Sequence, residues 1–110
     1  MQVHYIGALF DTSGYAEAGR NNVFALEKAD IDIKITAVSF EREKPNLGQA
    51  GLDLQELSKK TIDPKIQIIH LTPENFPRFI NRAKYNIGYT TWETSQLPDS
   101  WVPLINQMDE

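Results

Sequence analysis

Three short segments of this 110-residue chain combine residue types that bind or transform ligands. The first, residues 10–15, reads Phe-Asp-Thr-Ser-Gly-Tyr and follows an apolar run. A helix that begins there directs unpaired backbone N–H groups and the positive end of its dipole toward an anion, which makes Ser13 and Gly14 candidate phosphate ligands. The segment is neither a G-x-G-x-x-G nor a P-loop sequence, and a capped turn without a ligand is the alternative.

His70 stands at the end of a second apolar run, before Thr72 and Pro73. A histidine at a strand end can act as a general base or contact a sugar or phosphate, because its pKa lies near working pH. The alternative is a half-buried histidine that is hydrogen-bonded to the backbone. No second histidine or carboxylate stands at metal-ligand spacing, so we expect no metal site.

The third segment, residues 90–94, reads Thr-Thr-Trp-Glu-Thr and gathers hydroxyls, an indole and a carboxylate. Aromatic faces and carboxylates bind sugars well, and Glu93 at the mouth of a cleft would have a raised pKa. Thr90, Trp92 and Glu93 are therefore candidate substrate-binding residues. The alternative is that Trp92 closes the core and the threonines make turn hydrogen bonds.

Hydrophobic periodicity predicts the elements that position these segments. Strand patterns cover residues 3–10, 31–37, 66–71 and 85–90, with the second strand near a sheet edge. Helical spacing follows each of them: Ala16, Gly19, Val23 and Leu26 share one face, and Trp101, Leu104, Ile105 and Met108 share another. The alternation predicts an α/β fold with a mainly parallel sheet and helices on both faces.

The remaining helices are less regular. We expect a mobile loop over residues 41–51 and then a short helix, with Asp53 and Glu56 as a capping box and Leu52 and Leu57 as its staple. That helix should end at Asp63 and Pro64. Residues 75–83 predict a short or irregular helix, since Pro77 interrupts it.

Composition restricts the class of protein. The chain has 41% hydrophobic residues, a net charge of -4 and no cysteine, which indicates one globular domain over residues 1–110 without disulfides. Acidic and basic residues balance through residue 84, and four acids without a base follow. We therefore expect no nucleic-acid partner, and no apolar run long enough for a membrane span or signal peptide is present. A cytoplasmic location is expected.

Two motifs carry a resemblance to a known family. Residues 10–21, FDTSGYAEAGRN, resemble the opening SGYGEAARN segment of a group of GT-B fold glycosyltransferases. Residues 86–94, NIGYTTWET, with Leu97-Pro98 and Trp101-Val102, resemble their IGYTxWETxxLPxxWV segment. Ala16 and Gly19 replace a glycine and an alanine of the first motif, which leaves the turn itself intact.

The resemblance implies part of the N-terminal, acceptor-side Rossmann-like domain of a retaining, nucleotide-sugar-dependent transferase. Ser13, Gly14 and Tyr15 would face the donor diphosphate, while His70, Thr90, Trp92 and Glu93 would shape the acceptor side. His70 and Glu93 would be the catalytic candidates, and no cofactor or metal would be required. Most donor contacts would come from a C-terminal domain of the same chain, so the 110 residues alone would be inactive.

Two other functions are compatible with the sequence. One is a non-catalytic flavodoxin-like binding or regulatory domain that holds a carbohydrate or a protein partner, although Asp11 is the one acid suitably placed for a response regulator. The other is a degenerate transferase half that has kept the fold and lost its activity.

Overall fold

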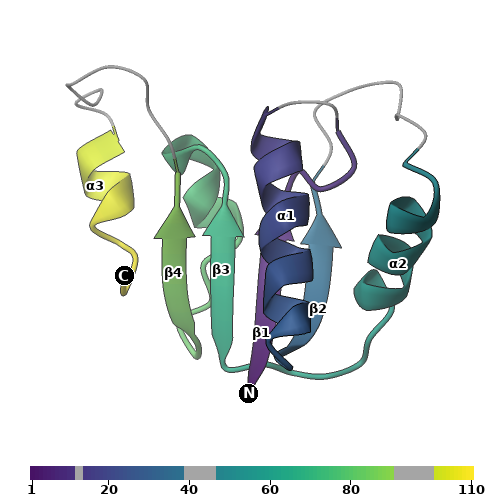
Figure 1. Cartoon of the computed structure of the whole chain (residues 1–110). Helices are drawn as coiled ribbons and strands as arrows, with labels where there is room; N and C mark the ends of the chain where they lie inside the picture. The colour runs from purple at the N-terminus through teal and green to yellow at the C-terminus, as the bar shows by residue number, and fades with distance from the viewer. Residues whose placement is uncertain (12–13, 39–46, 91–100) are drawn as a thin grey trace.

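The structure is a computed structural model that describes residues 1–11, 14–38, 47–90 and 101–110. Its described part contains a parallel four-stranded sheet with the order β2-β1-β3-β4 and flanking helices (Figure 1). The elements in chain order are β1 (Gln2–Gly7), α1 (Gly14–Lys28), β2 (Asp32–Ala37), α2 (Gln49–Ser58), β3 (Ile66–His70), the 3-10 helix η1 (Pro73–Arg78), β4 (Tyr85–Tyr89) and α3 (Val102–Ile105). The predicted α/β class is confirmed, and the arrangement is consistent with a Rossmann-like fold. No helix in these described ranges has the length and apolar character needed to cross a membrane.

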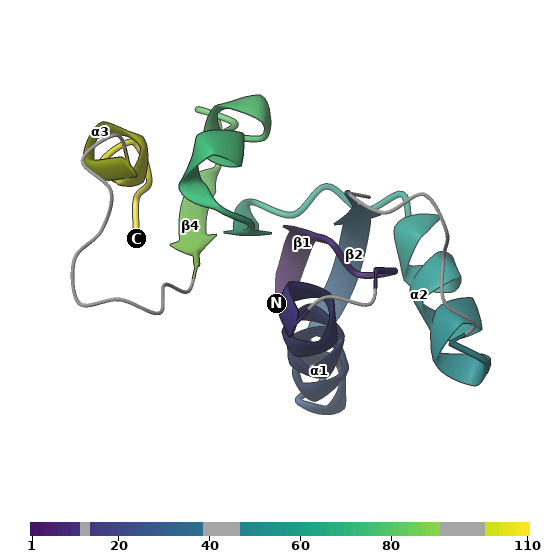
Figure 2. The same ribbon diagram turned by 90° about the horizontal axis from the view of Figure 1, so that it is seen from above.

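Side chains from the two faces of the sheet form two separate cores. One core joins Tyr5, Ile33 and Ile35 of the sheet to Val23 of α1 and Leu54 of α2. The other joins Ile6 and Ile69 to Phe76 of η1, with Ile105 and Met108 packed against it. Figure 2 shows α1 against one face, η1 and α3 on the other side, and α2 beside the edge strand β2. Helices therefore cover both faces, as predicted.

Helix α1 approaches the sheet closely through a glycine. Its predicted inner face is confirmed, because Ala16, Gly19 and Val23 are all buried. A Cβ atom at Gly19 would lie 2.8 Å from Leu9 Cδ2 and 3.6 Å from His70 Nδ1. A side chain at this position would therefore require the Leu9 side chain to shift.

Helix α2 corrects one prediction. It begins at Gln49 after Gly48, whose φ of 60° favours glycine, and it ends at Ser58 instead of at Asp63 and Pro64. Asp53 lies inside the helix and accepts a hydrogen bond from Gln49 Nε2 at 2.9 Å. The capping box of Asp53 with Glu56 is therefore wrong, because burial of Leu54 and Leu57 against β2 selects the helix face and Gly48 supplies the start.

The predicted hydrophobic staple is also wrong, and the predicted loop is wrong at residues 49–51. Leu52 was expected to pack over the helix entry but is 57% exposed. Residues 49–51 of the expected mobile loop form the first turn of α2, while the loop prediction for residues 41–46 lies outside the described residues.

The last two helical segments are shorter than predicted. The short or irregular helix predicted over residues 75–83 is the 3-10 helix η1, which begins at Pro73 and ends at Arg78. Its Pro73 and Pro77 lack the N–H groups that a longer helix requires. Helix α3 has four residues, with Pro103 in its first turn. Trp101, expected on the shared face of this helix, lies just before it and is buried.

Strand β4 buries its polar side and exposes its aromatic side. Tyr85 and Tyr89 are 45% and 43% exposed, whereas Asn86 is buried on the opposite face. Asn86 Oδ1 accepts a hydrogen bond from Gln67 Nε2 at 2.6 Å, and its Nδ2 donates to the carbonyl oxygens of Asn81 and Lys84. The side-chain amide of Asn86 therefore links the turn before β4 to the neighbouring strand β3.

The end of the chain lies alongside β4. The backbone N–H of Glu110 donates to Asn86 O at 3.2 Å, and Gly88 N–H donates to Glu110 O at 2.7 Å. This pair of bonds is the pattern of one parallel bridge, so Glu110 extends the sheet beside β4.

We expect Asn86→Ala to lower the free energy of unfolding by about 2–4 kcal/mol, because it leaves several buried backbone and amide groups without their partner. Urea unfolding followed by circular dichroism measures the change. The control is Asn21→Ala on the exposed side of α1, which should change stability by at most about 0.5 kcal/mol. Equal effects of the two substitutions would show that the Asn86 network does not hold the fold.

Candidate functional site

The carboxyl ends of the parallel strands meet at one edge of the sheet. The register places Gly7 of β1 opposite His70 of β3, and His70 opposite Tyr89 of β4. The chain passes from β1 to β2 on one side and from β3 to β4 on the other, so the strand order reverses between β1 and β3. In open parallel sheets, ligands bind outside the carboxyl ends of strands at such a reversal. Helix α1 begins at Gly14, shortly after β1 ends at this place (Figure 1).

His70 is the centre of a buried polar group at this edge. The residue is 2% exposed, and its Nδ1 lies 2.8 Å from the hydroxyl of Tyr5. Asn22 of α1 donates a hydrogen bond from Nδ2 to the same hydroxyl at 3.0 Å. The ring of Tyr89 meets His70 edge-on, with ring centroids 4.3 Å apart. Residues from β1, α1, β3 and β4 therefore converge on one imidazole.

Burial favours the uncharged forms of the His70 and Tyr5 side chains. Desolvation lowers the pKa of His70 from 6.5 to about 4 and raises the pKa of Tyr5 from 10.0 to about 12. The hydrogen bond from Asn22 opposes the rise at Tyr5 by favouring the phenolate. Both side chains are consequently neutral near pH 7, and the imidazole can donate one hydrogen bond and accept another without carrying charge.

The Arg20 side chain stabilises the connection between β1 and α1 through hydrogen bonds. Arg20 Nη1 donates to the carbonyl oxygens of Leu9 at 3.1 Å and Asp11 at 2.8 Å. Asp11 itself is buried. Arg20 lies in the second turn of α1, so its guanidinium joins the helix to the chain that leads into it and fixes where the first turn lies.

The structure places some of the predicted site residues. Gly14 and Tyr15 form the start of α1, His70 ends β3, and Thr90 directly follows β4, so all four lie at the carboxyl edge of the sheet. Ser13, Trp92 and Glu93 lie outside the described residues. The acceptor-side and diphosphate-side roles of these residues stay predictions.

Tyr5, Arg20 and Asn22 were not predicted as site residues. A tyrosine inside an apolar strand requires a partner for its hydroxyl when buried, and this signal identifies Tyr5 as half of a polar pair. Asn22 stands three residues after Gly19, on the side of the helix nearest the sheet. The pairing itself depends on the order of strands, which the sequence does not show.

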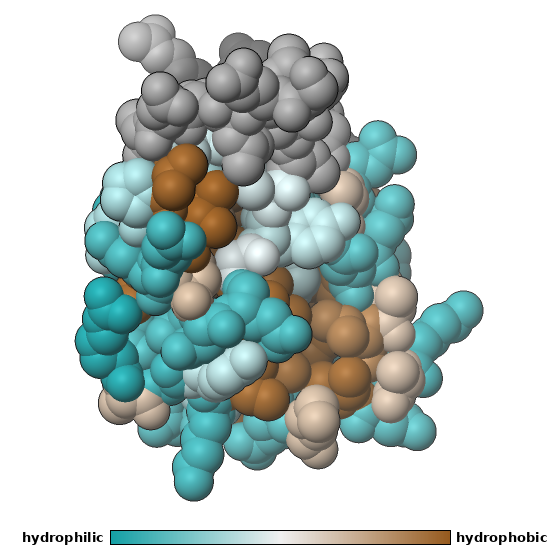
Figure 3. Space-filling view, turned by 90° about the vertical axis from the view of Figure 1, so that its left-hand side faces the viewer, coloured by the Kyte–Doolittle hydropathy of each residue, from teal (hydrophilic) through white to brown (hydrophobic). Residues whose placement is uncertain are grey.

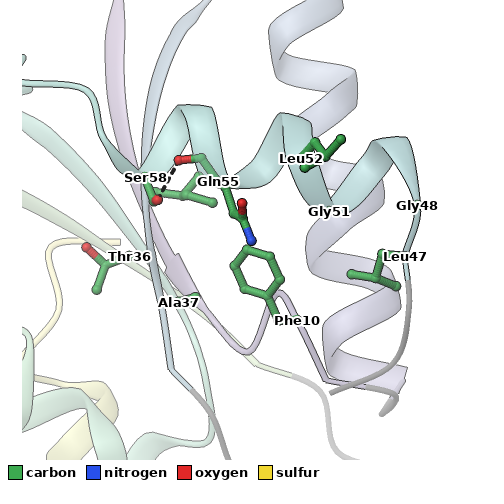
Figure 4. A pocket seen from close by; sticks show the side chains of 10 residues that line it. Phe10, Thr36, Ala37, Leu47, Gly48, Gly51, Leu52, Gln55 and Ser58 are labelled. Atoms are coloured by element: carbon green, nitrogen blue, oxygen red, sulfur yellow. Dashed lines mark hydrogen bonds between the residues drawn. The ribbon is translucent and has the colours of Figure 1, made fainter.

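A cavity lies elsewhere, between β2 and α2, with a volume of about 710 Å³ (Figure 4). Phe10, Ile35, Leu47 and Leu52 form apolar walls, and Gln55 adds an amide. Among the described candidate residues, neither His70 nor Thr90 lines it. This cavity is therefore separate from the group around His70.

A smaller hollow of about 250 Å³ opens between α1 and β4. Tyr5 and Asn22 of the His70 group reach it, together with Ala25, Leu26, Ile68 and Tyr89. Figure 3 shows hydrophobic surface on this side of the molecule. On the α1 side of the sheet, strand β4 is therefore less completely covered than the strands that lie under α1.

The described side chains that contact His70 are neutral, and Arg20 adds a cation at the β1–α1 connection. No group of three histidine, aspartate or glutamate side chains in residues 1–11, 14–38, 47–90 and 101–110 is arranged to hold a metal ion. The helix start, the neutral imidazole and the braced backbone suit the binding of an oxygen-rich anion better than proton transfer.

Comparisons of the chain with protein-family models, curated proteins and solved structures found no match.

We expect the protein to lose stability as the pH falls from about 7 to about 5. His70 and His4 both have their pKa lowered to about 4, His4 through burial and then repulsion from Lys34. The unfolded chain therefore binds protons more readily below about pH 6.5, and the free energy of unfolding decreases until about pH 4. His70 contributes about 1–2 kcal/mol of this loss.

Urea unfolding at the two pH values measures the effect in the wild type and in His70→Asn. His4 is present in both proteins and serves as the internal reference. The variant should lose about 1–2 kcal/mol less than the wild type. The same loss in both proteins would show that His70 is not held neutral by the fold.

Proposed function

We propose that this chain is the acceptor-side part of the N-terminal Rossmann-like domain of a GT-B glycosyltransferase. The whole enzyme would transfer a sugar from a nucleotide-sugar donor to a carbohydrate or glycan acceptor, with retention of configuration. The observation that carries the proposal is the position of the FDTSGY segment: α1 begins in it, at the carboxyl edge where the strand order reverses. This is the position that a diphosphate-binding turn requires.

The proposed roles come from the resemblance of the two motifs to that family. Ser13, Gly14 and Tyr15 would serve the diphosphate side, where backbone amides of the first helical turn stabilise negative charge on the leaving group. His70, Thr90, Trp92 and Glu93 would serve the acceptor side and align the attacking hydroxyl. A C-terminal domain of the same polypeptide would supply most contacts to the donor, so the isolated chain binds weakly and does not turn over.

Nuclear magnetic resonance of the 15N-labelled chain tests the diphosphate site. Uridine, guanosine and adenosine diphosphates are added in turn, with free glucose as a separate titration. We expect concentration-dependent shifts at the amides of residues 14–16 for at least one diphosphate, with a dissociation constant of about 1 mM or weaker. Absence of shifts at these amides up to about 10 mM of all three diphosphates would contradict the proposal.

Substitution of Arg20 tests whether diphosphate binding depends on the position of the first turn of α1. Arg20→Met removes the two hydrogen bonds that fix the β1–α1 connection, so it should weaken diphosphate binding by about tenfold. Lys28→Met removes the same charge at the far end of α1 and should leave binding within about twofold. The same NMR titration measures both variants. Equal weakening by both would indicate a general charge effect instead of a positioned site.

The alternative, a flavodoxin-like binding or regulatory domain, is favoured by the cavity between β2 and α2. Its volume of about 710 Å³ and its mixed lining suit a small ligand or a partner side chain. In the same titrations, shifts confined to Gly48, Gly51 and Gln55 would favour this alternative over the transferase.

A further inference from the structure

Strand β2 lies at one end of the described sheet and pairs there with β1 alone. Val38 N–H donates to Gly7 O at 2.8 Å, so even-numbered residues bond to β1 and odd-numbered residues direct their backbone N–H and C=O away from it. Of these, Ile35 is buried and Ala37 is exposed. In the part of the chain that the structure describes, no hydrogen bond to the Ala37 N–H or C=O is present. The edge of β2 is therefore open at its carboxyl end, whereas Glu110 pairs with the opposite edge at β4.

The cavity between β2 and α2, with a volume of about 710 Å³, lies along this open edge. Residues 35–37 form its wall on the strand side. The wall on the side of α2 consists of residues that recur at spacings of three and four, namely Gly51, Leu52, Gln55 and Ser58 (Figure 4). The cavity is thus bounded by a strand edge and by one side of a helix, and its volume is within the range of ligand sites.

The lining of this cavity combines backbone polar groups with apolar side chains. Phe10, Leu47 and Leu52 supply the large apolar side chains, and none of the residues that line the cavity is acidic or basic. Ala37 supplies a hydrogen-bond donor and an acceptor. Peptides that add to a sheet edge are bound in this way, through main-chain hydrogen bonds and through pockets for alternate side chains. An uncharged, extended peptide with large apolar side chains matches both features.

We propose that the cavity between β2 and α2 binds an extended peptide segment of a partner protein, which adds to the edge of β2 as a further strand. Ala37 donates its N–H to one peptide residue and accepts a hydrogen bond from the same residue through its C=O. An apolar side chain of the peptide packs against Phe10, Leu47 and Leu52. This inference concerns a different place from the start of α1 and does not rest on the proposed function.

Nuclear magnetic resonance of the 15N-labelled chain tests the proposal with three blocked pentapeptides, acetyl-Thr-X-Thr-X-Thr-amide, in which X is valine, leucine or phenylalanine. We expect at least one to bind with a dissociation constant of about 1 mM or tighter and to slow hydrogen exchange at the Ala37 amide by about tenfold or more. The amides of Gly48 and Gly51 should shift in the same titration. Absence of these shifts with all three peptides up to about 10 mM would overturn the proposal. Slow exchange at Ala37 in the free chain would overturn it as well, because the edge would already be paired.

Modified peptides distinguish an added strand from a small apolar ligand. The best-binding pentapeptide is N-methylated at either of two adjacent central residues. Because alternate residues of a strand face its neighbour, one of the two peptides should lose binding by about tenfold or more and the other should lose much less. Equal binding of both modified peptides and the parent peptide would overturn strand addition. Binding of the single blocked amino acid acetyl-X-amide as tight as that of the pentapeptide would do the same, and would indicate a small-molecule pocket.

Substitutions test the two walls of the cavity. Ala37→Pro removes the N–H at the free edge and leaves the bonds to β1 in place, so it should weaken peptide binding by about fivefold or more. Leu52→Ala shortens the apolar wall and should weaken binding several-fold, whereas Val102→Ala, at a similarly exposed apolar residue of α3, should not. Unchanged binding by a folded Ala37→Pro chain, or equal weakening by the two alanine variants, would overturn the proposal. If Ala37→Pro does not fold, the N-methylated peptides decide the same hydrogen-bond pairing from the ligand side.

Discussion

The parallel hydrogen-bonded register of β1, β3 and β4 is the constraint on which the candidate site depends. It places Gly7, His70 and Tyr89 at the same level, although the three residues are far apart in the sequence. A shift of one residue would turn each side chain to the other face of the sheet, so His70 would leave Tyr5 and enter the core around Phe76. The two hydrophobic cores prevent such a shift, because each requires its own set of alternate side chains.

Each face of the sheet also contains one buried polar group that is fully hydrogen-bonded. Under α1 this group is His70 with Tyr5 and Asn22, and on the opposite face it is Asn86 with Gln67. In the described ranges, no buried side-chain nitrogen or oxygen lacks a partner. A buried polar atom left without a hydrogen bond would reduce stability. Both groups therefore favour the observed strand pairing more specifically than apolar packing alone does. The group under α1 differs because it reaches the carboxyl edge, where ligands bind in this class of fold.

The sequence predicted the elements better than their ends. Alternating and helical spacings are strong for β2 and α1, whose inner residues are buried as predicted. The start of α2 was placed at Asp53 because its capping signature is local, whereas the actual start depends on Gly48 and on the packing of Leu54 against β2. The buried side of β4 could not be predicted either, because Asn86 is buried through its bonds to Gln67 and to the turn before β4. The position of His70 at a strand end was predictable, but its link to Tyr5 requires the strand order.

The central proposal is that the start of α1, at the carboxyl edge of the sheet, binds a diphosphate. A crystal structure of the chain grown with a nucleoside diphosphate tests this most directly. The account predicts phosphate density within hydrogen-bonding distance of the first-turn amides of α1. Density for the nucleotide in the cavity between β2 and α2 instead would contradict it.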